Sequence, residues 1–339
     1  MSNITIKDVA KAANVSIATV SRVLNKNKKV NPEISRKVNA AIDELGYFPN
    51  NAARTLKGDN TKTIAFIASD ISNFFFTTMA RSIEDVLNNN GYNLIVCSTD
   101  DSQERELGYL QLLRVKHVDG IIINMTARNT KYIASLSQDM PIALFGRSIT
   151  DAAFHGDFVD NDNEDGIYRL TNLLIDDGHR RIGMINGQSY VSSAQERLRG
   201  YRKALSQHGI GLSDDYLYTG HFNSPATAEA GAAKLLSLPE PPTAIIASNN
   251  ILSIGVMSYC RKNNIAIPDD ISLCSFGSLE EYGLLYVQPT FADQTPALMG
   301  AKLAEMIIQR INAKNKLSNR EVRFIPPISI GNSVKSIPE

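Results

Sequence analysis

The stretch TIKDVAKAANVSIATVSRVLN, residues 5–25, predicts two short helices joined by a tight turn. Thr5 supplies a hydroxyl N-cap, and Asp8 follows as an acidic partner for the first turn. Apolar residues recur at helical spacing up to Ala13, so one face of this helix is expected to meet a core. The chain then turns at residues 14 and 15, and Ser16 is placed to cap the second helix.

The second helix is expected to have an inner aliphatic face, at positions 20, 23 and 24, and an outer face of different character. The outer side chains are small, apolar or basic: Ile17, Ala18, Ser21 and Arg22. A short helix pair with such an outer face is typical of a recognition helix for the DNA major groove. A third helix is expected to be capped by Asn31, to begin at Pro32 and to end at Gly46. The alternative is that residues 5–45 form only a small three-helix core.

Charge favours the DNA-binding interpretation. Residues 1–60 hold ten Lys/Arg and five Asp/Glu, a net charge of +5. The whole chain holds 35 basic and 35 acidic residues, so residues 61–339 carry 25 and 30 and a net charge of −5. A basic N-terminal part on a neutral chain is expected to bind polyanions, and the remainder is not.

The rest of the composition is that of a globular protein with no membrane partner. Of the 339 residues 43% are apolar, but no apolar run approaches the roughly 20 residues of a membrane span. The N-terminus has no apolar export segment. The three cysteines form no CxxC pair, and Cys97 and Cys274 lie in apolar strand-like runs, which predicts buried thiols in a reducing compartment. We therefore expect a cytoplasmic protein.

From Thr61 onward, apolar strand-like runs alternate with helical stretches. The predicted strands are 63–69, 92–98, 119–124, 141–146, 181–187, 215–222, 243–249 and 271–277, with helices near 74–90, 102–116, 164–177, 194–208, 225–237 and 250–263. This alternation predicts parallel sheets covered on both faces, in two consecutive lobes. Ligands of such α/β folds bind at the carboxyl ends of the strands, so a cleft between the lobes is the expected ligand site.

An enzyme is not expected. The sequence contains no GxSxG, HExxH, GxxxxGK[ST] or GxGxxG motif, and its five histidines have no metal-ligand spacing. His179 lies in a turn between helix and strand, where a structural role is expected. We predict no catalytic residue, no metal and no cofactor.

The run at residues 5–25, followed by GYFPNNAARTLKG at 46–58, resembles the LacI/GalR family of bacterial transcription regulators. The similarity continues through the body, as in LIDDGHRRIGMING (174–187), RLRGYRKAL (197–205) and FADQTPALMG (291–300). The resemblance implies a transcriptional repressor that binds a palindromic operator as a homodimer and responds to a small-molecule effector. An exported solute-binding protein without DNA function is the alternative, which the basic N-terminal part argues against.

The resemblance also implies a domain plan. Residues 1–48 would form an all-α helix-turn-helix head, and residues 49–60 a hinge helix that orders on DNA. Residues 61–339 would form an effector-binding and dimerisation body, a two-lobed α/β fold like a type I periplasmic binding protein. Its N-terminal lobe would be about 62–161 plus 292–320, and its C-terminal lobe 162–291 plus 321–339. The C-terminus carries no leucine heptads, so a dimer is expected rather than a tetramer.

In the head, the resemblance places Ile17, Ala18 and Arg22 against base edges. A guanidinium fork matches guanine O6 and N7, whereas Ile17 and Ala18 offer only apolar contact. Positioning contacts to the DNA backbone would come from Thr5, Ser16, Thr19, Ser21, Asn25 and Lys29, and hinge contacts from Asn50, Ala53 and Leu56. Leu56 would act as the minor-groove wedge of the hinge. Alternatively residues 49–60 are an inert linker, because so short a polar segment holds no helix alone.

In the body, the resemblance assigns the effector to Asn73, Phe75, Phe76, Arg147, Ser193, Arg197, Phe222, Asn249 and Phe276. Two departures concern the cleft loops: Phe74 replaces a usual proline, and Asn250 a usual aspartate. Two others remove carboxylates, since Gly146 and Gly277 stand where aspartates are usual.

Losing two carboxylates makes a negatively charged effector easier to tolerate. We therefore expect a carbohydrate acid or phosphate, or a ligand smaller than a hexose. A purine is not expected, because Val191 stands where purine-binding relatives have an arginine.

Overall fold

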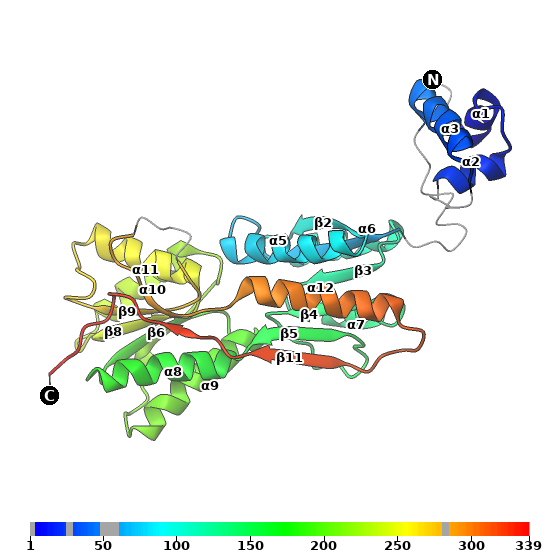
Figure 1. Ribbon diagram of the computed structural model, residues 1–339. Coiled ribbons are helices and arrows are strands. Elements are labelled where there is room, and N and C mark those ends of the chain that lie inside the picture. The colour runs from blue at the N-terminus through cyan, green and yellow to red at the C-terminus, as the bar shows by residue number, and fades with distance from the viewer. Residues whose placement is uncertain (1–3, 25–29, 48–60, 280–284, 339) are drawn as a thin grey trace. The chain divides into compact units, whose positions relative to one another are not determined.

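The computed structural model describes residues 4–24, 30–47, 61–279 and 285–338 (Figure 1). The chain separates into two compact units, residues 1–61 and residues 62–339. The predicted DNA contacts Asn25, Lys29, Asn50, Ala53 and Leu56 lie outside the described residues.

The first unit contains three helices, α1 (Ile6–Ala12), α2 (Ile17–Leu24) and α3 (Pro32–Leu45). They pack around a small aliphatic core in which Val9, Val20 and Val38 are fully buried. The turn between α1 and α2 passes through Asn14 at φ 51°, a left-handed conformation that asparagine tolerates better than most residues. The tight turn predicted from the sequence is therefore present.

Side chains cap all three helices of this unit. The Asp8 carboxylate accepts hydrogen bonds from the Thr5 backbone N–H (2.8 Å) and hydroxyl (2.7 Å). These hydrogen bonds, the hydroxyl first, hold the pKa of Asp8 below its ordinary value. Ser16 Oγ accepts from the Thr19 N–H at 3.2 Å, and Asn31 Oδ1 accepts from the N–H at the start of α3 at 2.8 Å. Such caps are worth about 1 kcal/mol each.

The second unit consists of two lobes, each built on a six-stranded sheet. The first sheet has the order β11-β5-β4-β3-β1-β2, and all its strands are parallel. Its members are β1 (Thr63–Ala68), β2 (Asn93–Ser98), β3 (Gly120–Ile123), β4 (Ile142–Phe145), β5 (Asp157–Asn161) and β11 (Arg320–Phe324). Its helices are α5 (Phe74–Asn89), α6 (Gln103–Val115), α7 (Thr130–Leu136) and α12 (Pro296–Asn312).

The second sheet has the order β12-β10-β9-β8-β6-β7, parallel except for β12. Its members are β6 (Ile182–Asn186), β7 (Leu217–Thr219), β8 (Ala244–Ala247), β9 (Ser272–Phe276), β10 (Thr290–Ala292) and β12 (Ile328–Ser329). Its helices are α8 (Asn163–Asp176), α9 (Ser192–Gln207), α10 (Pro225–Leu236) and α11 (Asn250–Lys262). A 3₁₀ turn, Asp214–Tyr216, occupies the start of the predicted strand 215–222, so β7 is shorter than expected.

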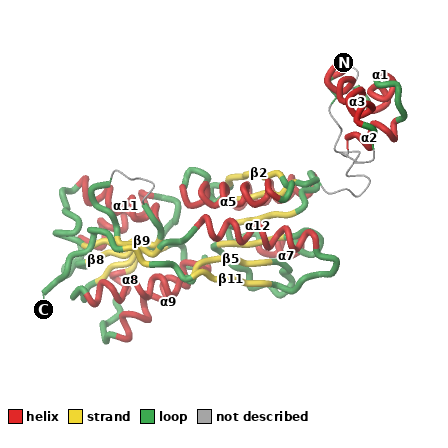
Figure 2. The backbone as a smooth tube through the Cα atoms, viewed as in Figure 1, coloured by secondary structure: helices red, strands yellow, loops and turns green. Residues whose placement is uncertain are grey.

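Each sheet lies between two layers of helices, as Figure 2 shows. In the first lobe one buried cluster joins the sheet to α5 and α12, and another joins it to α6 and α7. In the second lobe the corresponding clusters involve α8 and α9 on one face and α10 and α11 on the other. Burial on both faces explains why the strands are continuously apolar rather than alternating.

The chain crosses between the lobes three times, after β5, after β10 and after β11. The third crossing was expected near 321, with residues 321–339 in the second lobe. That boundary is wrong, because β11 pairs in parallel with β5 along its whole length, from Arg320 opposite Asp157 to Phe324 opposite Asn161. The chain therefore leaves the first lobe only after Phe324.

All three cysteines are free and buried. Burial raises the pKa of the Cys97 and Cys274 thiols and that of Cys260 to about 11, so none is a reactive thiolate near neutral pH. Across the described residues, no helix combines the length and apolarity needed to cross a membrane.

Candidate functional sites

The outer face of α2 is the candidate nucleic-acid interface. Ile17, Ala18 and Arg22 are exposed, whereas Val20 and Val23 are buried, so the division of faces predicted from the sequence is present. Ile17 is 45% exposed, which is unusual for a large aliphatic side chain. Within the described residues the Arg22 guanidinium forms no ion pair. The Arg22 guanidinium and the exposed side chains of Ile17 and Ala18 form a surface that is suited to contact base edges in a DNA groove.

Ser16 and Thr5, two of the residues predicted to contact the DNA backbone, also cap helices. Ser16 caps α2, and its hydroxyl lies 2.9 Å from the hydroxyl of Thr19. The Thr5 hydroxyl instead donates to the Asp8 carboxylate at 2.7 Å. A hydroxyl in such a cap can still offer one further hydrogen bond, since it combines one donor with two acceptor lone pairs.

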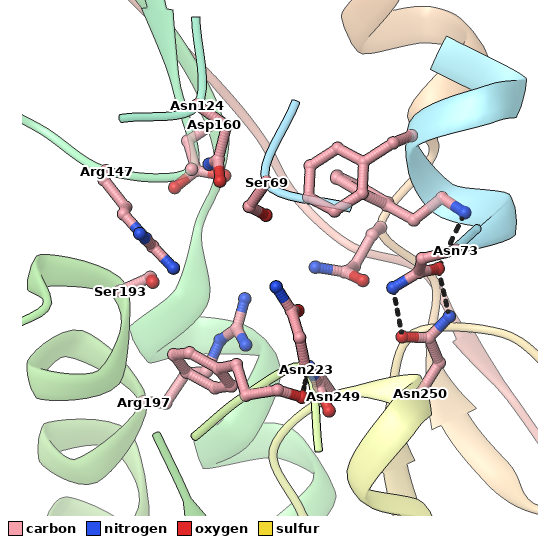
Figure 3. Close-up of a pocket in the computed structure, with 15 residues that line it drawn as sticks. Ser69, Asn73, Asn124, Arg147, Asp160, Ser193, Arg197, Asn223, Asn249 and Asn250 are labelled. Atoms are coloured by element: carbon pink, nitrogen blue, oxygen red, sulfur yellow. Dashed lines mark hydrogen bonds between the residues drawn. The ribbon is translucent and has the colours of Figure 1, made fainter. Parts of the chain in front are cut away.

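The second candidate site is a pocket between the two lobes of the body (Figure 3). Eight of the nine predicted effector residues line it, from Asn73 in the first lobe to Asn249 in the second. The exception is Phe276, which is fully buried beneath Arg197 with its ring centroid 4.2 Å from the guanidinium carbon. Seven further residues line the pocket without having been assigned to the effector: Ser69, Asn124, Gly146, Asp160, Asn223, Asn250 and Gln294. Gly146 and Asn250 are two of the departures noted in the sequence, and the other five were missed.

Four of these seven residues lie at the carboxyl ends of strands in the first sheet. Ser69 and Asn124 come directly after β1 and β3, Gly146 follows β4, and Asp160 lies at the end of β5. The carboxyl ends of parallel strands meet at one edge of a sheet, so the residues after each predicted strand were the available signal. Asp160 and Gln294 could not be found this way, because β5 and β10 were not predicted.

Three helices begin at this pocket. Asn73 caps α5 by accepting the Phe75 N–H at 3.0 Å, and Asn249 caps α11 by accepting the Leu252 N–H at 2.8 Å. The N-terminus of α9 has no side-chain cap, and Ser193 in its first turn lines the pocket. Helix N-termini carry partial positive charge, so all three favour a negative ligand group.

Hydrogen bonds and two aromatic rings hold the Arg197 side chain in place at the pocket. Its Nε donates to Oδ1 of Asn163 at 2.9 Å and its Nη1 to the carbonyl of Ser248, while the guanidinium stacks between Phe222 and Phe276. Its side chain forms no ion pair within the described residues. Burial lowers the pKa of Arg197 to about 10, which leaves it charged at neutral pH.

Arg147 and Asp160 are the other charged residues of the lining. Nη1 of Arg147 donates to Asp101 at 2.5 Å and to the Met125 carbonyl at 2.7 Å. Asp160 is 3% exposed, and burial raises its pKa to about 6. Its two carboxylate oxygens accept from the Asn161 N–H (2.8 Å) and the Asn163 amide (2.9 Å).

Gly146 and Gly277 differ in their position but share one property. Both have positive φ, 67° and 107°, and an added Cβ would meet an amide of the lining. At Gly146 the contact is 2.7 Å to Asn124 Nδ2, and at Gly277 it is 2.6 Å to Gln294 Oε1. The space next to each glycine is thus taken by a neutral amide, from Asn124 after β3 and from Gln294 after β10. No group of three or more potential metal ligands occurs among the described residues.

Comparison with known families agrees with this division into two parts. Residues 5–50 match the family described as bacterial regulatory proteins, lacI family. Residues 61–328 match the periplasmic binding proteins and sugar binding domain of the LacI family.

Individual relatives match over nearly the whole chain. The HTH-type transcriptional repressor PurR of Vibrio campbellii is 31% identical over 333 residues, covering 98% of this chain and 99% of that protein. PurR of Photobacterium profundum is also 31% identical, over 339 residues, at 98% and 99% coverage. Among solved structures, the lac repressor dimer bound to operator and the anti-inducer ONPF has a TM-score of 0.83 at 22% identity, covering 98% of this chain and all of that one. A transcriptional regulator CelR–cellobiose complex has a TM-score of 0.73 at 24% identity, covering 97% and 99%.

Proposed function

The chain belongs to the LacI family of bacterial regulatory proteins, DNA-binding repressors with an effector-binding domain, and we propose that it binds a palindromic operator as a homodimer. A small molecule in the interlobe pocket would control that binding, in the cytoplasm. The observation that carries the DNA part is the exposed face of Ile17, Ala18 and Arg22 in an N-terminal part, residues 1–60, of net charge +5. Arg22 would read a guanine, and the apolar pair would contact bases such as thymine.

The hinge contribution rests on the family resemblance. Asn50, Ala53 and Leu56 would order on the operator, with Leu56 inserted at the central base step. Asn25 and Lys29 would add phosphate contacts beside α2.

The first lobe supports the dimer proposal. Strand β2 is the edge of its sheet, and it exposes Ile95 (41%) and Val96 (45%) to solvent. On the following helix Leu112 and Val115 are 48% and 73% exposed. A sheet edge with exposed apolar side chains is a liability in a monomer, so a second copy of the chain is the proposed cover. Two subunits would also match the two half-sites of a palindrome.

A carbohydrate-derived ligand fits the lining of the pocket. Six side-chain amides surround it, and an amide both donates and accepts, as sugar hydroxyls do: Asn73, Asn124, Asn223, Asn249, Asn250 and Gln294. The cavity of about 60 Å³ has room for about four to six water molecules. One sugar ring or a smaller group would fill this space. Solved relatives have bound cellobiose or ribose. Val191 packs fully buried in the core of the second lobe, so the side chain at this position offers no polar contact to a purine.

The proposed control acts through the angle between the lobes. Arg197 of the pocket is adjacent in sequence to Glu196, which accepts two hydrogen bonds of 3.0 Å from Arg323 of β11. A ligand held by Arg197 would therefore act on a residue pair that joins the second lobe to the first. The resulting lobe movement would permit or prevent ordering of the hinge on DNA.

Salt-dependent DNA binding tests the regulator against a solute-binding protein. The logarithm of a regulator's duplex affinity falls linearly with the logarithm of salt concentration, because neutralised phosphates release counterions. Fluorescence anisotropy with the full chain and duplex fragments should show such a slope. Absence of duplex binding at low salt would leave only the solute-binding alternative.

A further inference from the structure

The two positive-φ glycines determine the charge of the pocket. With Gly146 and Gly277 in place of aspartates, Asn124 and Gln294 approach so closely that an added side chain would have to displace them. The replacement is therefore a change of chemistry and not only a deletion: two carboxylates are missing, and a neutral amide of the lining approaches each glycine instead. The lining then contains two arginines and one carboxyl group.

Both arginines retain unused hydrogen-bond donors. Arg147 uses only Nη1, and Arg197 uses Nε and Nη1, in the contacts made by the described residues. The two residues are only 4% and 5% exposed as a whole, but none of their nitrogen atoms is among the buried side-chain atoms of the described residues that lack a partner, so their remaining N–H groups reach the space of the pocket. A ligand in the pocket can accept hydrogen bonds from these groups, and a charged acceptor forms stronger hydrogen bonds than a neutral one.

The surroundings favour an anion at the same place. Figure 3 shows Arg147, Ser193 and Arg197 on one side of the pocket, with Ser193 between the two arginines. Ser193 belongs to the uncapped first turn of α9, whose backbone N–H groups have no partner within the helix. The two guanidinium groups and the positive end of a 16-residue helix are thus brought to one wall.

Asp160 is the one lining group that opposes an anion. Each of its oxygens already accepts one hydrogen bond, from Asn161 and from Asn163, which stabilises the carboxylate and leaves about half of its acceptor sites for a ligand. Its pKa of about 6 also makes its protonation accessible when a negative group approaches. Asp160 weakens the preference of the pocket for an anion, and so does Asp101, which lies outside the lining but forms an ion pair with Arg147 at 2.5 Å. The preference therefore rests on the free N–H groups of the two arginines and on the N-terminus of α9.

We propose that the effector is a monosaccharide-sized carbohydrate bearing a carboxylate or a phosphate, with that anionic group on the wall formed by Arg147, Ser193 and Arg197. Its hydroxyls would contact the amides of the opposite side, including Gln294. This inference rests on the proposed function, since it names the ligand of the same pocket.

The test compares neutral sugars with their charged counterparts on the full chain. Thermal unfolding and isothermal titration would use ribose and ribose 5-phosphate, glucose, gluconate and glucose 6-phosphate, and inorganic phosphate alone. An anionic member is expected to bind at least about tenfold tighter than its neutral parent, as charge-assisted hydrogen bonds imply. Gluconate and glucose 6-phosphate distinguish a carboxylate from a phosphate. The proposal fails if a neutral sugar binds as tightly as its acid or phosphate, or if no anion of the set, inorganic phosphate included, stabilises the protein.

A charge variant checks that binding occurs in this pocket. The Gln294 side chain makes no hydrogen bond within the described residues, so Gln294→Glu returns a carboxylate at little cost to the fold. It should weaken the anion at least about tenfold. Gln207→Glu adds the same charge on the exposed end of α9 and should leave binding unchanged. Equal effects of the two variants would overturn the assignment. Duplex binding is measured in parallel: if it persists while the anions fail, only the ligand class is wrong.

Discussion

Asn73 and Asn250 pair with each other across the cleft through both side-chain amides. Nδ2 of Asn73 donates to Oδ1 of Asn250 at 3.2 Å, and Nδ2 of Asn250 donates to Oδ1 of Asn73 at 2.9 Å (Figure 3). Asn73 caps α5 in the first lobe and Asn250 begins α11 in the second. Both are buried, so this neutral pair contributes directly to holding the lobes together.

A double-mutant cycle should measure that contribution. Asn73→Ala also removes the cap of α5, but this local cost cancels in the cycle with Asn250→Ala. Two neutral hydrogen bonds predict a coupling free energy of about 1–2 kcal/mol in denaturant unfolding. A control cycle with Asn88→Ala, on the exposed side of α5, should be additive. Additivity in both cycles would show that the pair does not stabilise lobe closure.

Replacing Arg22 by Ala should reduce discrimination between operator and unrelated duplex by about 1–3 kcal/mol, because a base-reading fork is lost. Lys37→Ala is the control, since Lys37 pairs with Glu33 on the exposed surface of α3. Competitive anisotropy with both duplexes measures the discrimination. An equal loss on both duplexes would assign Arg22 to a phosphate instead of a base.

Leu56→Ala should cut operator affinity while leaving ligand binding to the body intact, as the wedge role implies. Leu212→Ala, which truncates an exposed leucine of the body, serves as the control. Operator affinity and ligand affinity are measured on the same preparations. Unchanged operator affinity in Leu56→Ala would refute the wedge.

Asp160 should make the body less stable as pH rises from about 4 to 6. Its folded pKa of about 6 lies above its ordinary 3.8, so the folded state holds a proton that the unfolded state has lost between these values. The loss of stability accumulates over this range, is about 3 kcal/mol at pH 7, and changes little above the folded pKa. Facing charges are Arg197 and Glu196 of α9 and Arg323 of β11.

Asp160→Asn should therefore gain stability relative to the unsubstituted protein as pH rises from 4 to 6, measured by urea unfolding at each pH. Asn88→Ala, an exposed substitution that changes no titratable group, should show no such trend. A stability difference for Asp160→Asn that does not change with pH would contradict the shifted titration.

Asp157 shows the opposite behaviour. It is fully buried between Arg310 (2.6 Å) and Arg320 (2.8 Å). Burial raises the pKa of Asp157, but the hydrogen bonds from Arg320 and Arg310 lower it by more, so the pKa lies below its ordinary value. Stability from this group is present above its unfolded pKa and is lost as pH falls through the folded one. Asp157→Asn should cost about 3–5 kcal/mol at pH 7, since it leaves two arginines short of a counter-charge. A loss below about 1 kcal/mol in urea unfolding would show that the arginines find other partners.

The sequence predicts this fold well where a residue's environment is set locally. The caps at Ser16 and Asn31, the face of α2 and the long apolar strands all follow from neighbours within a few positions. Strand β11, with the sequence REVRF, reads as a polar surface segment, and only its pairing with β5 makes it part of the first sheet. Short strands such as β10 likewise depend on long-range pairing that leaves no local pattern.

The site divides in the same way. Family resemblance placed Arg197 and Asn249 because they lie in matching motifs. It did not reveal that Asn124 and Gln294 would occupy the space beside Gly146 and Gly277, because those pairs are brought together only by the sheets. The consequence for ligand charge could be expected from the missing aspartates, but the groups that take their place could not.

The most direct measurement is capture of genome fragments of the source organism on the purified full chain at moderate salt, followed by sequencing. We predict enrichment of a near-palindrome, which would be weaker with Arg22→Ala. No enriched sequence, with or without cell extract as a source of effector, would contradict the regulator and leave the interlobe pocket as the only function.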